Sequence, residues 1–423
     1  MYSLKGENPT KLYLTALTDL VEKGDTCQPR GKLIKELRPA SIEFTNPYNR
    51  VTFLGGRKIN PFFQIAESLW ILSGRADVEW LIKFNANMKQ FSDDGVWFNA
   101  PYGERLRSWG KNALHNTIIN PIDQMMDAYT KLLHDKDTRQ AVMVISNPSF
   151  DNSKYTIGEQ GKDIACNLVV TFKIRNNRLN MTVFNRSNDA HWGLWGANLC
   201  QFTTIQETMW SWLKNSGNSD FEDLNIGDYC QVTDSLHIYL DDYGSKCTTD
   251  VFDYYKTHDK SEVEDDFTCV NEPRMSLSEK EFERFLTVYW NIIDSFIVSD
   301  SCLMDDAQVS DLLSLLDEYQ TTKILDEYWY FGIKSMISYR LLRLEQPKKA
   351  LEIVCQLQDC QWKISMLYFL KYSLVKIGTD ESRMSEFQEL LGIFESAVES
   401  VSQSLQYQEN KDALKSYLLG LSR

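Results

Sequence analysis

A cysteine stands at the start of an alternating apolar run in the stretch GKDIACNLVVTF, residues 161–172. Free cysteine is among the most commonly buried residue types, so Cys166 alone is either a small core side chain or a nucleophile at the mouth of a sheet. Two polar clusters follow it, FNRSNDAHWGLWGANLCQF at 184–202 and DSLHIYL at 234–240. They supply residue types that bind anions and favour a thiolate.

Two further positions carry side chains that could take part in binding or catalysis. Glu67 stands among apolar residues of the stretch NPFFQIAESLWILSG, and a carboxylate is rarely fully buried without a partner or a task. His237 and Tyr239 are separated by one residue in a strand-like run, so they share one face of the strand. Taken alone, this pair could equally be partly buried packing of the sheet.

These motifs occur in a fixed order. Glu67 and Tyr102 precede Cys166, the runs Arg-Ser-x-Asp and G-x-x-x-x-N follow within 186–198, and His-x-Tyr ends the series. In this order and spacing, the chain from about residue 8 to 245 resembles thymidylate synthase and its relatives, the pyrimidine-nucleotide hydroxymethylases. Each piece is a weak signal, whereas the whole series is specific.

The resemblance implies covalent catalysis by Cys166. The C5 carbon of a pyrimidine is a poor nucleophile, and a thiolate that adds to C6 converts C5 into an enolate-like carbon that attacks a one-carbon donor. The charge of Arg186 would favour the thiolate. Glu67 would be the general acid–base group at the ring carbonyl and the folate, and Tyr102 would lie near C5, where a proton must leave.

The resemblance also implies a phosphate clamp built from several chain segments. Arg186 and Ser187 would form part of it, Arg30 would come from an N-terminal loop, and Arg139 would reach in from the second subunit of a homodimer. Guanidinium groups suit this task because their forked donors bind two phosphate oxygens at once.

The remaining site residues implied by the resemblance contact the sugar, the base and the co-substrate. His237 and Tyr239 would hold the ribose 3′-hydroxyl, and Asn198 would read the base. Asp189 would bond the pterin of methylenetetrahydrofolate, which is the expected one-carbon donor. The expected partners are thus a pyrimidine nucleoside monophosphate, folate and a second copy of the chain, with no metal ion.

The sequence departs from the family pattern in ways that bear on the product. The family's Pro-Cys-His is here Ala165–Cys166–Asn167, and a strict register places Ala197 rather than Asn198 at the base-reading position. One of two usual arginines is replaced at Gln140, and the paired tryptophans before Tyr102 and the C-terminal closing tail are missing. Uracil and cytosine both remain open as the base.

Two outcomes of the reaction and one alternative function follow from these departures. Hydride transfer would give a methyl product and water would give a hydroxymethyl product; loss of residues that exclude water favours the second. The alternative is a synthase-like module that binds or senses nucleotide without turnover and serves the C-terminal part of the chain.

The elements that position these residues alternate between helix and strand. Apolar spacing predicts helices over 8–25, 60–74 and 196–214. Alternation and β-branched content predict strands over 40–47, 50–56, 139–146, 166–177, 178–187 and 228–240, with a hairpin turn at Asn176–Asn177. The expected fold is α+β, a thymidylate synthase-like mixed sheet with helices, followed by an all-α C-terminal domain.

Three regions are expected along the chain: a catalytic domain at 1–245, an acidic connector at 246–275 and a helical domain at 276–423. Ser278 and Glu281 form a capping box before the first helix of the last region. Further helices are predicted over 308–320, 322–344, 347–358, 361–376 and 382–406. Nothing in them names a partner, and the simplest interpretation is a packing or interaction domain.

Composition limits the class of protein. The 423-residue chain has a net charge of −14, which argues against nucleic-acid binding because that requires a broad basic face. No apolar run approaches the length of a membrane helix, and the N-terminal residues lack the pattern of a secretory signal. Nine cysteines without a C-x-x-C pair argue against a disulfide framework, so a reducing, cytoplasmic location is expected.

Overall fold

The computed structural model describes residues 1–53, 55–57, 59–151, 161–257, 267, 271–298, 306–405 and 410–419. The chain forms two compact units and passes between them more than once. The first unit comprises Met1–Arg50, Gln64–Ser245 and Ser276–Phe282; the second comprises Val51–Phe63, Lys246–Met275 and Glu283–Arg423. The domain limits expected at 245 and 276 stay a prediction.

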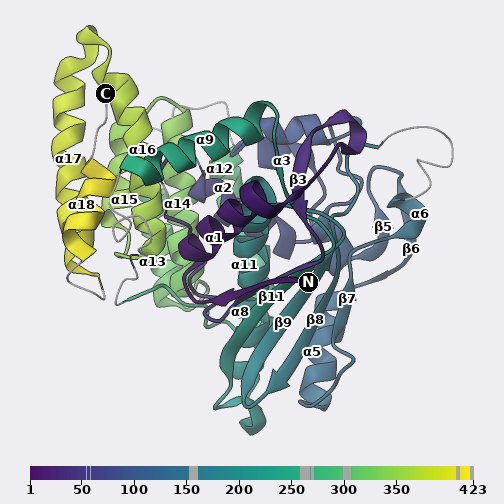
Figure 1. The fold of residues 1–423 in the computed structure, drawn as a ribbon. Helices are drawn as coiled ribbons and strands as arrows, with labels where there is room; N and C mark the ends of the chain where they lie inside the picture. The colour runs from purple at the N-terminus through teal and green to yellow at the C-terminus, as the bar shows by residue number, and fades with distance from the viewer. Residues whose placement is uncertain are drawn as a thin grey trace. The chain divides into compact units, whose positions relative to one another are not determined.

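A six-stranded mixed sheet forms the centre of the first unit (Figure 1). Strands β1 and β4 are parallel, as are β9 and β11, and the other neighbours are antiparallel. In spatial order the strands are β1 (Tyr2–Gly6), β4 (Ala40–Phe44), β11 (Asn225–Thr233), β9 (Arg178–Asn185), β8 (Asn167–Arg175) and β7 (Val142–Val144).

The hairpin of β8 and β9 fixes the geometry of the site. Asn176 and Asn177 both have φ of 53°, the left-handed conformation that a two-residue turn between twisted strands requires. Alternate residues of β8, such as Val170 and Phe172, are buried in the core. The turn prediction is confirmed. The turn sets the register as far as the pair Val169–Phe184, and a bulge between Asn167 and Val169 then shifts it by one residue, which pairs Asn167 with Asn185 at the far end of the hairpin.

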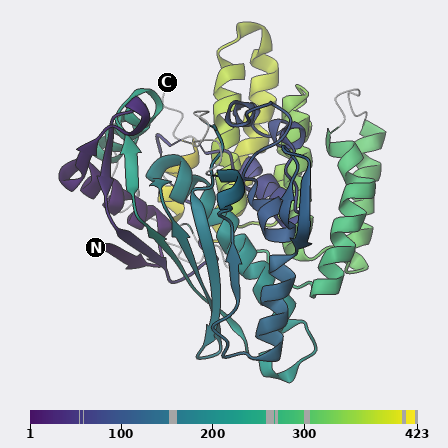
Figure 2. The same ribbon diagram turned by 90° about the vertical axis from the view of Figure 1, so that its right-hand side faces the viewer.

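Helices cover the sheet and connect its strands. Helix α8 (Leu199–Lys214) runs along β9 and β11 (Figures 1 and 2), where Gln206 Nε2 donates to the carbonyl of Leu179 at 2.9 Å. The other elements of this unit are α1 (Pro9–Lys23), α2 (Pro61–Leu72), α3 (Val78–Ile82), α4 (Tyr102–Arg107), α5 (Gln124–His134), α6 (Pro148–Asp151), the short helices η1 (Pro29–Gly31), η2 (Ala86–Phe91) and η4 (Ser219–Phe221), and the hairpin β5 (Trp109–Asn112) with β6 (Thr117–Ile122).

The single strand predicted over 228–240 is wrong. The chain leaves the large sheet after β11 and enters a four-stranded sheet as β12 (Leu236–Tyr239). Two backbone hydrogen bonds fix the change, from Asp234 N to Asn185 O at 3.1 Å and from Asn188 N to Ser235 O at 2.8 Å. The smaller sheet has the order β10 (Asn188–Asp189), β12, β3 (Ile34–Leu37) and β2 (Asp25–Cys27).

The strand predicted over 50–56 is also wrong. Residues 51–53 have no regular structure and 55–56 form a turn, while residue 54 lies outside the described residues. Gly56 has φ of +80°, and a Cβ there would lie 2.4 Å from the carbonyl oxygen of Asp250. A Cβ on Gly55 would lie 2.1 Å from the ring of Tyr254. The two glycines therefore serve a close approach of backbone to its neighbours rather than a strand.

The second unit is helical, so the prediction of an α+β fold followed by a helical region is confirmed. The capping box is present, because Ser278 N and Oγ both donate to Glu281 Oε2, at 2.8 and 2.7 Å. The helices are α11 (Glu279–Val288), η5 (Tyr289–Ile293), α12 (Asp294–Val298), α13 (Asp306–Thr321), α14 (Glu327–Arg343), α15 (Pro347–Gln356), α16 (Gln361–Gly378), η6 (Glu381–Arg383), α17 (Met384–Gln403) and α18 (Lys411–Leu419).

Part of the expected acidic connector is a helix, α9 (Asp242–Thr257). Its Cys247 and Val251 are buried one helical turn apart, while acidic residues such as Asp253 are exposed. The described acidic residues of α9 such as Asp253 therefore lie on the solvent side of an amphipathic helix. Residues 258–266 of the expected connector lie outside the described residues.

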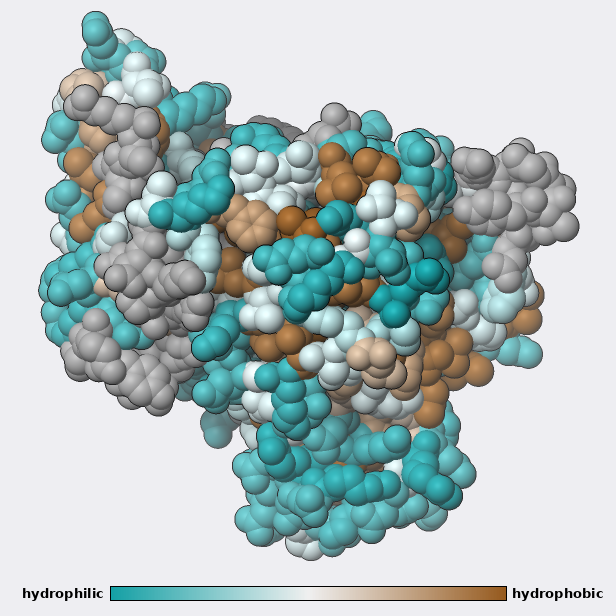
Figure 3. All heavy atoms as spheres, viewed as in Figure 1, coloured by the Kyte–Doolittle hydropathy of each residue, from teal (hydrophilic) through white to brown (hydrophobic). Residues whose placement is uncertain are grey.

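Polar side chains cover much of the face shown in Figure 3, interrupted by separate apolar patches. Within the described part of the chain, no helix has the length and apolar character needed to cross a membrane.

A buried ion pair fastens the loop after β4 to α8. Arg50 Nη2 donates to Glu207, and both side chains are at most 2% exposed. We expect Arg50→Ala to lower the free energy of unfolding by about 3–5 kcal/mol, because it leaves a carboxylate buried without its partner. Urea denaturation measures the change.

The double variant Arg50→Met/Glu207→Met is the matched control, because it removes both charges. It should recover more than half of the stability lost in Arg50→Ala. If the double variant is as unstable as the single variant, the loss comes from packing and not from the unpaired charge.

Candidate active site

Antiparallel pairing places Arg186 directly beside Cys166. Cys166 immediately precedes β8 and Arg186 immediately follows β9, and the backbone N–H of Arg186 donates to the carbonyl of Cys166 at 3.0 Å. The guanidinium then turns back over the thiol, with Nη2 3.6 Å from Cys166 Sγ. It is fixed there because Nε donates to Ala165 O at 2.9 Å and Nη2 to Ile164 O at 3.0 Å.

Burial and charge act on the Cys166 thiol in opposite directions. Burial raises its pKa and is the largest effect, while the positive charges of Arg186 and Arg30 lower it and the negative charge of Asp163 raises it. The net pKa is above the ordinary value, so the free protein holds a neutral thiol at neutral pH. Arg186 acts in the predicted direction, but its charge does not outweigh burial.

Asn167 joins three parts of the site. Its Nδ2 donates to Tyr102 Oη at 2.9 Å and to Asn198 Oδ1 at 3.3 Å, and its backbone N–H also donates to Tyr102 Oη at 3.4 Å. Its Oδ1 accepts from Asn185 Nδ2 and, at 3.1 Å, from Gln231 Nε2. The residue that replaces the family's histidine is therefore the centre of a buried network, a role that the sequence did not indicate.

Tyr102 begins helix α4, and its hydroxyl reaches the residue next to Cys166. Burial raises its pKa, a thiolate at Cys166 would raise it further, and the two hydrogen bonds from Asn167 lower it. The hydroxyl oxygen accepts both of these bonds, so its proton remains available to another acceptor.

Asn198 lies inside the site despite its offset from the family register. Residues Ala190–Asn198 form a π-helical segment, η3, and a π-turn contains one residue more than an α-turn. The wider turn absorbs the extra residue of this sequence and brings Asn198, rather than Ala197, to the network. Asn198 is 6% exposed, and its Nδ2 donates to Asn188 Oδ1 at 3.2 Å.

Glu67 lies on α2 within the same unit, 9% exposed. Burial raises its pKa to about 7, against a hydrogen bond with Gln201 that lowers it. A carboxyl group with this pKa exists in both protonation states near neutral pH, which suits a general acid–base group.

His237, Tyr239 and Asp189 meet in the smaller sheet. The ring centroids of His237 and Tyr239 are 5.3 Å apart, and the two rings are perpendicular. The parallel pairing of β10 with β12 sets Asp189 opposite His237. Burial lowers the pKa of His237, so the imidazole is neutral. The Asp189 carboxylate caps η3, because Oδ1 accepts from His191 N at 3.0 Å and Oδ2 from Trp192 N at 3.1 Å.

Three residues of the expected phosphate clamp differ in their placement. Arg30 has φ of 52° in η1 and lies close enough to Tyr239 and Cys166 for its charge to lower both pKa values. Ser187 follows Arg186 and is half-buried. Arg139 is exposed in the turn before β7 and bonds to no other site residue among those described.

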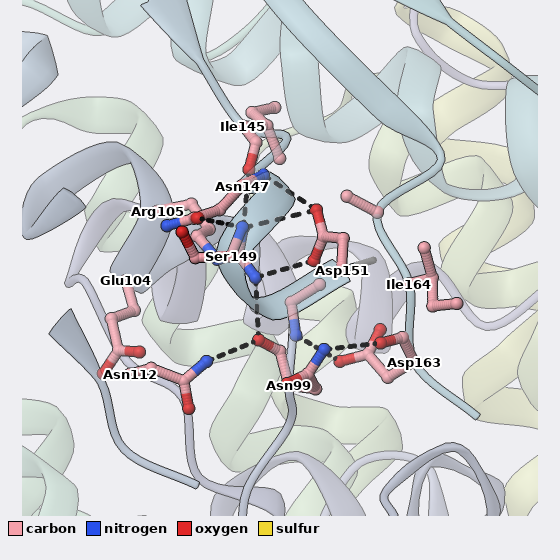
Figure 4. A network of polar contacts seen from close by, with 12 residues as sticks. Asn99, Glu104, Arg105, Asn112, Ile145, Asn147, Ser149, Asp151, Asp163 and Ile164 are labelled. Atoms are coloured by element: carbon pink, nitrogen blue, oxygen red, sulfur yellow. Dashed lines mark hydrogen bonds and ion pairs between the residues drawn. The ribbon is translucent and has the colours of Figure 1, made fainter. Parts of the chain in front are cut away.

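A second polar network was missed by the sequence analysis (Figure 4). Buried Arg105 pairs with Asp151 at 2.9 Å and donates to Asn99 O at 3.0 Å, and Asn99 Nδ2 donates to Asp163 O at 3.1 Å. Burial raises the pKa of Asp163 to about 6. An acidic residue in KDIAC, beside the expected nucleophile, was the available signal.

Metal binding has no support among the described residues, where no group of three or more His, Cys, Asp or Glu side chains could hold an ion. The side chains described at the site carry a thiol, guanidinium groups, amides, carboxyl groups, phenols and an imidazole.

Comparison with known proteins matches this region to one family. The family model described as thymidylate synthase matches residues 11–247. A deoxyuridylate hydroxymethyltransferase of Bacillus phage SP01 is 46% identical over 88% of this chain and 94% of its own length. Proteins of the same name from Pseudomonas phage M6 and Delftia phage PhiW-14 are 36% and 33% identical over 56% and 48% of this chain, which is 62% and 52% of their own lengths.

The raised pKa of Glu67 makes stability depend on pH. Between the ordinary value of about 4.5 and about 7, the folded protein holds a proton on Glu67 that the unfolded chain lacks, so this group's contribution to stability falls as pH rises through that window. Glu67→Gln removes the dependence. We expect the variant to gain on the order of 2–3 kcal/mol relative to the native protein between pH 5 and pH 8 in urea denaturation.

Glu79→Gln on α3 is the control, because that side chain is exposed. Its stability should run parallel to that of the native protein across the same pH range. Parallel curves for Glu67→Gln as well would show that Glu67 is ionised at all of these pH values.

Proposed function

The chain belongs to the thymidylate synthase family, and on that premise we propose that it hydroxymethylates deoxyuridylate at C5 through a covalent bond between Cys166 and C6. It is an enzyme that transfers a one-carbon group to a pyrimidine nucleotide, which confirms the prediction from the sequence. A module without turnover is not favoured, because the SP01 relative, similar over nearly its whole length, bears the name of an enzyme.

One observation carries the choice of Cys166. Its sulfur has a guanidinium at 3.6 Å, and the next residue bonds both Tyr102 and Asn198. A buried structural cysteine has no need of a cation, a phenol and a base-reading amide around it, whereas addition to a pyrimidine ring uses all three.

The proposed steps use these groups in turn. The thiol of Cys166 would lose its proton to water as the nucleotide binds, its sulfur would bond to C6, the ring electrons would move to C5 and O4, and C5 would attack the one-carbon unit of methylenetetrahydrofolate. The proton that leaves C5 would pass to a water molecule held by the hydroxyl of Tyr102, and tetrahydrofolate would be expelled to leave an exocyclic methylene. Water would then add to this methylene, the bond between sulfur and C6 would break to return the thiolate, and Glu67 would exchange protons with the ring carbonyl and the folate.

We propose that uracil is the base because the amide of Asn198 can serve it. Asn198 accepts from Asn167 and donates to Asn188, which leaves one donor and one acceptor position for the ring. The O4 of uracil can accept from the amide NH₂, and the N3–H of uracil can donate to the amide oxygen. His237 and Tyr239 would hold the sugar 3′-hydroxyl.

The phosphate would bind to Arg186, Ser187 and Arg30, with Arg139 supplied by the second subunit of a homodimer. Support for the dimer comes from the outer face of the large sheet, where Val144 and Phe184 are 38% and 40% exposed and both pair with Val169 on β8. Exposed apolar side chains on neighbouring strands are typical of an interface.

The residues present fit a folate co-substrate. Each carboxylate oxygen of Asp189 accepts one N–H and keeps a second lone pair for a pterin. Beside it, Trp192 is 41% exposed and can stack on an aromatic ring. Methylenetetrahydrofolate supplies the one-carbon unit when bound. The paired tryptophans expected near the folate are missing before Tyr102, and the loss of residues that exclude water supports the hydroxymethyl product over the methyl product.

We also retain two proposals from the sequence: residues 1–245 form the catalytic region ahead of the helical domain, and the enzyme acts in the cytoplasm. The second rests on the absence of a disulfide pattern among the nine cysteines.

Cys166→Ala should abolish the release of tritium from C5-tritiated deoxyuridylate, because no adduct forms to activate C5. Nucleotide binding should remain measurable by calorimetry. Cys360→Ala is the control, since Cys360 is buried in the second unit, and it should release tritium. Release at the native rate by Cys166→Ala would remove Cys166 from the mechanism.

The product distinguishes the two outcomes of the reaction. Incubation with methylenetetrahydrofolate and each pyrimidine monophosphate, read by mass spectrometry, should give a product about 30 mass units heavier from deoxyuridylate. A gain of about 14 would indicate methylation, and product from deoxycytidylate alone would contradict the assignment of uracil.

Arg186→Gln should weaken binding of the nucleoside monophosphate by about 10–100-fold, because a forked cationic donor is lost from the phosphate. Binding of the nucleoside without phosphate should change far less. Arg178→Gln, at the opposite end of β9, is the matched control and should bind both ligands as the native protein does. Equal losses for both ligands would place Arg186 away from the phosphate.

A further inference from the structure

Two hydrogen bonds join the segment that carries Tyr102 to the segment that carries Cys166 (Figure 4). The backbone N–H of Ala100 donates to Asp163 Oδ2 at 2.7 Å, and Asn99 Nδ2 donates to the carbonyl of Asp163 at 3.1 Å. Asp163 is therefore bonded to the neighbouring segment through both its side chain and its backbone.

This junction rests on a rigid, buried base. Asn99 O accepts from Arg105 Nη2 and from Asn112 Nδ2, both at 3.0 Å. The guanidinium of Arg105 is fully buried, donates to Ile145 O at 3.0 Å and pairs with Asp151. A displacement of Asn99 would therefore break contacts of a buried ion pair, which makes the position of Asp163 hard to change.

Asp163 also brings a negative charge to the nucleophile. Its carboxylate raises the pKa of the Cys166 thiol, and its own pKa of about 6 leaves it mainly ionised at neutral pH. Four other groups interact electrostatically with the sulfur. Arg186 and Arg30 favour the thiolate, and the other two are the hydroxyls of Tyr102 and Tyr239.

We propose that Asp163 is a positioning residue with two effects: its hydrogen bonds fix the segment of Tyr102 against that of Cys166, and its negative charge, three residues before the sulfur, adds to burial in disfavouring the thiolate. A protonated thiol resists oxidation and alkylation, because the thiolate is the reactive form. Asp163 thus adds to the protection that burial gives the nucleophile before the substrate is bound. The inference rests on the proposed role of Cys166, but its first test reads the thiol and not the reaction.

Asp163→Asn removes the charge and keeps an oxygen atom that can accept the hydrogen bond from the backbone N–H of Ala100. The test measures the rate at which iodoacetamide alkylates the Cys166-containing peptide between pH 6 and pH 10, by mass spectrometry of the full-length enzyme. We expect the midpoint of the pH dependence of alkylation to fall by about half to one pH unit. At pH 7, alkylation should become about threefold faster.

Asp93→Asn is the matched control. Asp93 Oδ1 also accepts a backbone N–H from this stretch, that of Lys162 at 2.9 Å, and it is absent from the groups that act on the thiol. Its midpoint should equal that of the native enzyme. An unchanged or higher midpoint in Asp163→Asn overturns the effect of charge.

Asp163→Ala tests the positioning effect, because it also removes the acceptor. We expect kcat for tritium release to fall at least about tenfold more than in Asp163→Asn, with KM for the nucleotide changed less than about threefold. Equal kcat values for the two variants overturn the positioning effect. If Asp163→Ala fails to fold, the comparison is made with Asn99→Ala, which removes the other bond of the junction.

The two proposals fail in distinguishable ways. If Cys166 is not the nucleophile, Cys166→Ala keeps tritium release whatever the Asp163 variants do. If Asp163 has no role, Cys166→Ala loses release and the alkylation midpoint does not move.

Discussion

The register of the β8–β9 hairpin is the constraint on which the site depends. Pairing of Asn167 with Asn185 places Cys166 opposite Arg186, and a guanidinium beside the sulfur follows from that pairing. A slip of one residue would turn these side chains to the other face of the sheet. The turn at the opposite end of the hairpin, with two asparagines in the left-handed conformation, sets the register as far as Val169 and Phe184, and a bulge between Asn167 and Val169 shifts it by one residue before the site. The turn and the bulge together thus determine the geometry of a reactive centre at the far end of two strands.

Burial is the strongest influence on the ionisable groups of this site. It raises the pKa of Cys166, Glu67 and Asp163, and it lowers that of His237. Nearby charges and hydrogen bonds modify each value without reversing it. The free enzyme is therefore close to neutral around the sulfur, apart from the guanidiniums and Asp163. Such a site keeps its nucleophile protonated and two carboxyl groups poised to exchange protons near neutral pH.

The sequence indicated the order of the motifs better than it indicated the surroundings of each residue. Cys166 and Arg186 were proposed as site residues from their places in a series of motifs that resembles one family, and the hairpin turn was predicted from its paired asparagines. The roles of Asn167 and Asp163 were missed, because amides and carboxylates are common and their function depends on neighbours that are distant in sequence.

The errors in the fold have related causes. The split between β11 and β12 depends on hydrogen bonds to Asn185 and Asn188, which lie far from that segment in the chain. The two glycines before α2 were interpreted as the end of a strand, although they serve contacts with α9. The π-helical segment η3 was the least predictable element. Motif spacing alone does not indicate that a π-helical segment brings Asn198 to the network.

The most direct test of the account is to trap the bond between sulfur and ring. A deoxyuridylate with fluorine at C5 has no proton to lose there, so an adduct formed with methylenetetrahydrofolate should persist. We expect mass spectrometry of the digested enzyme to find the nucleotide and the folate together on the peptide that contains Cys166. An adduct on a peptide with a different cysteine, or an enzyme that stays unmodified while it still binds the fluorinated nucleotide, would contradict the account.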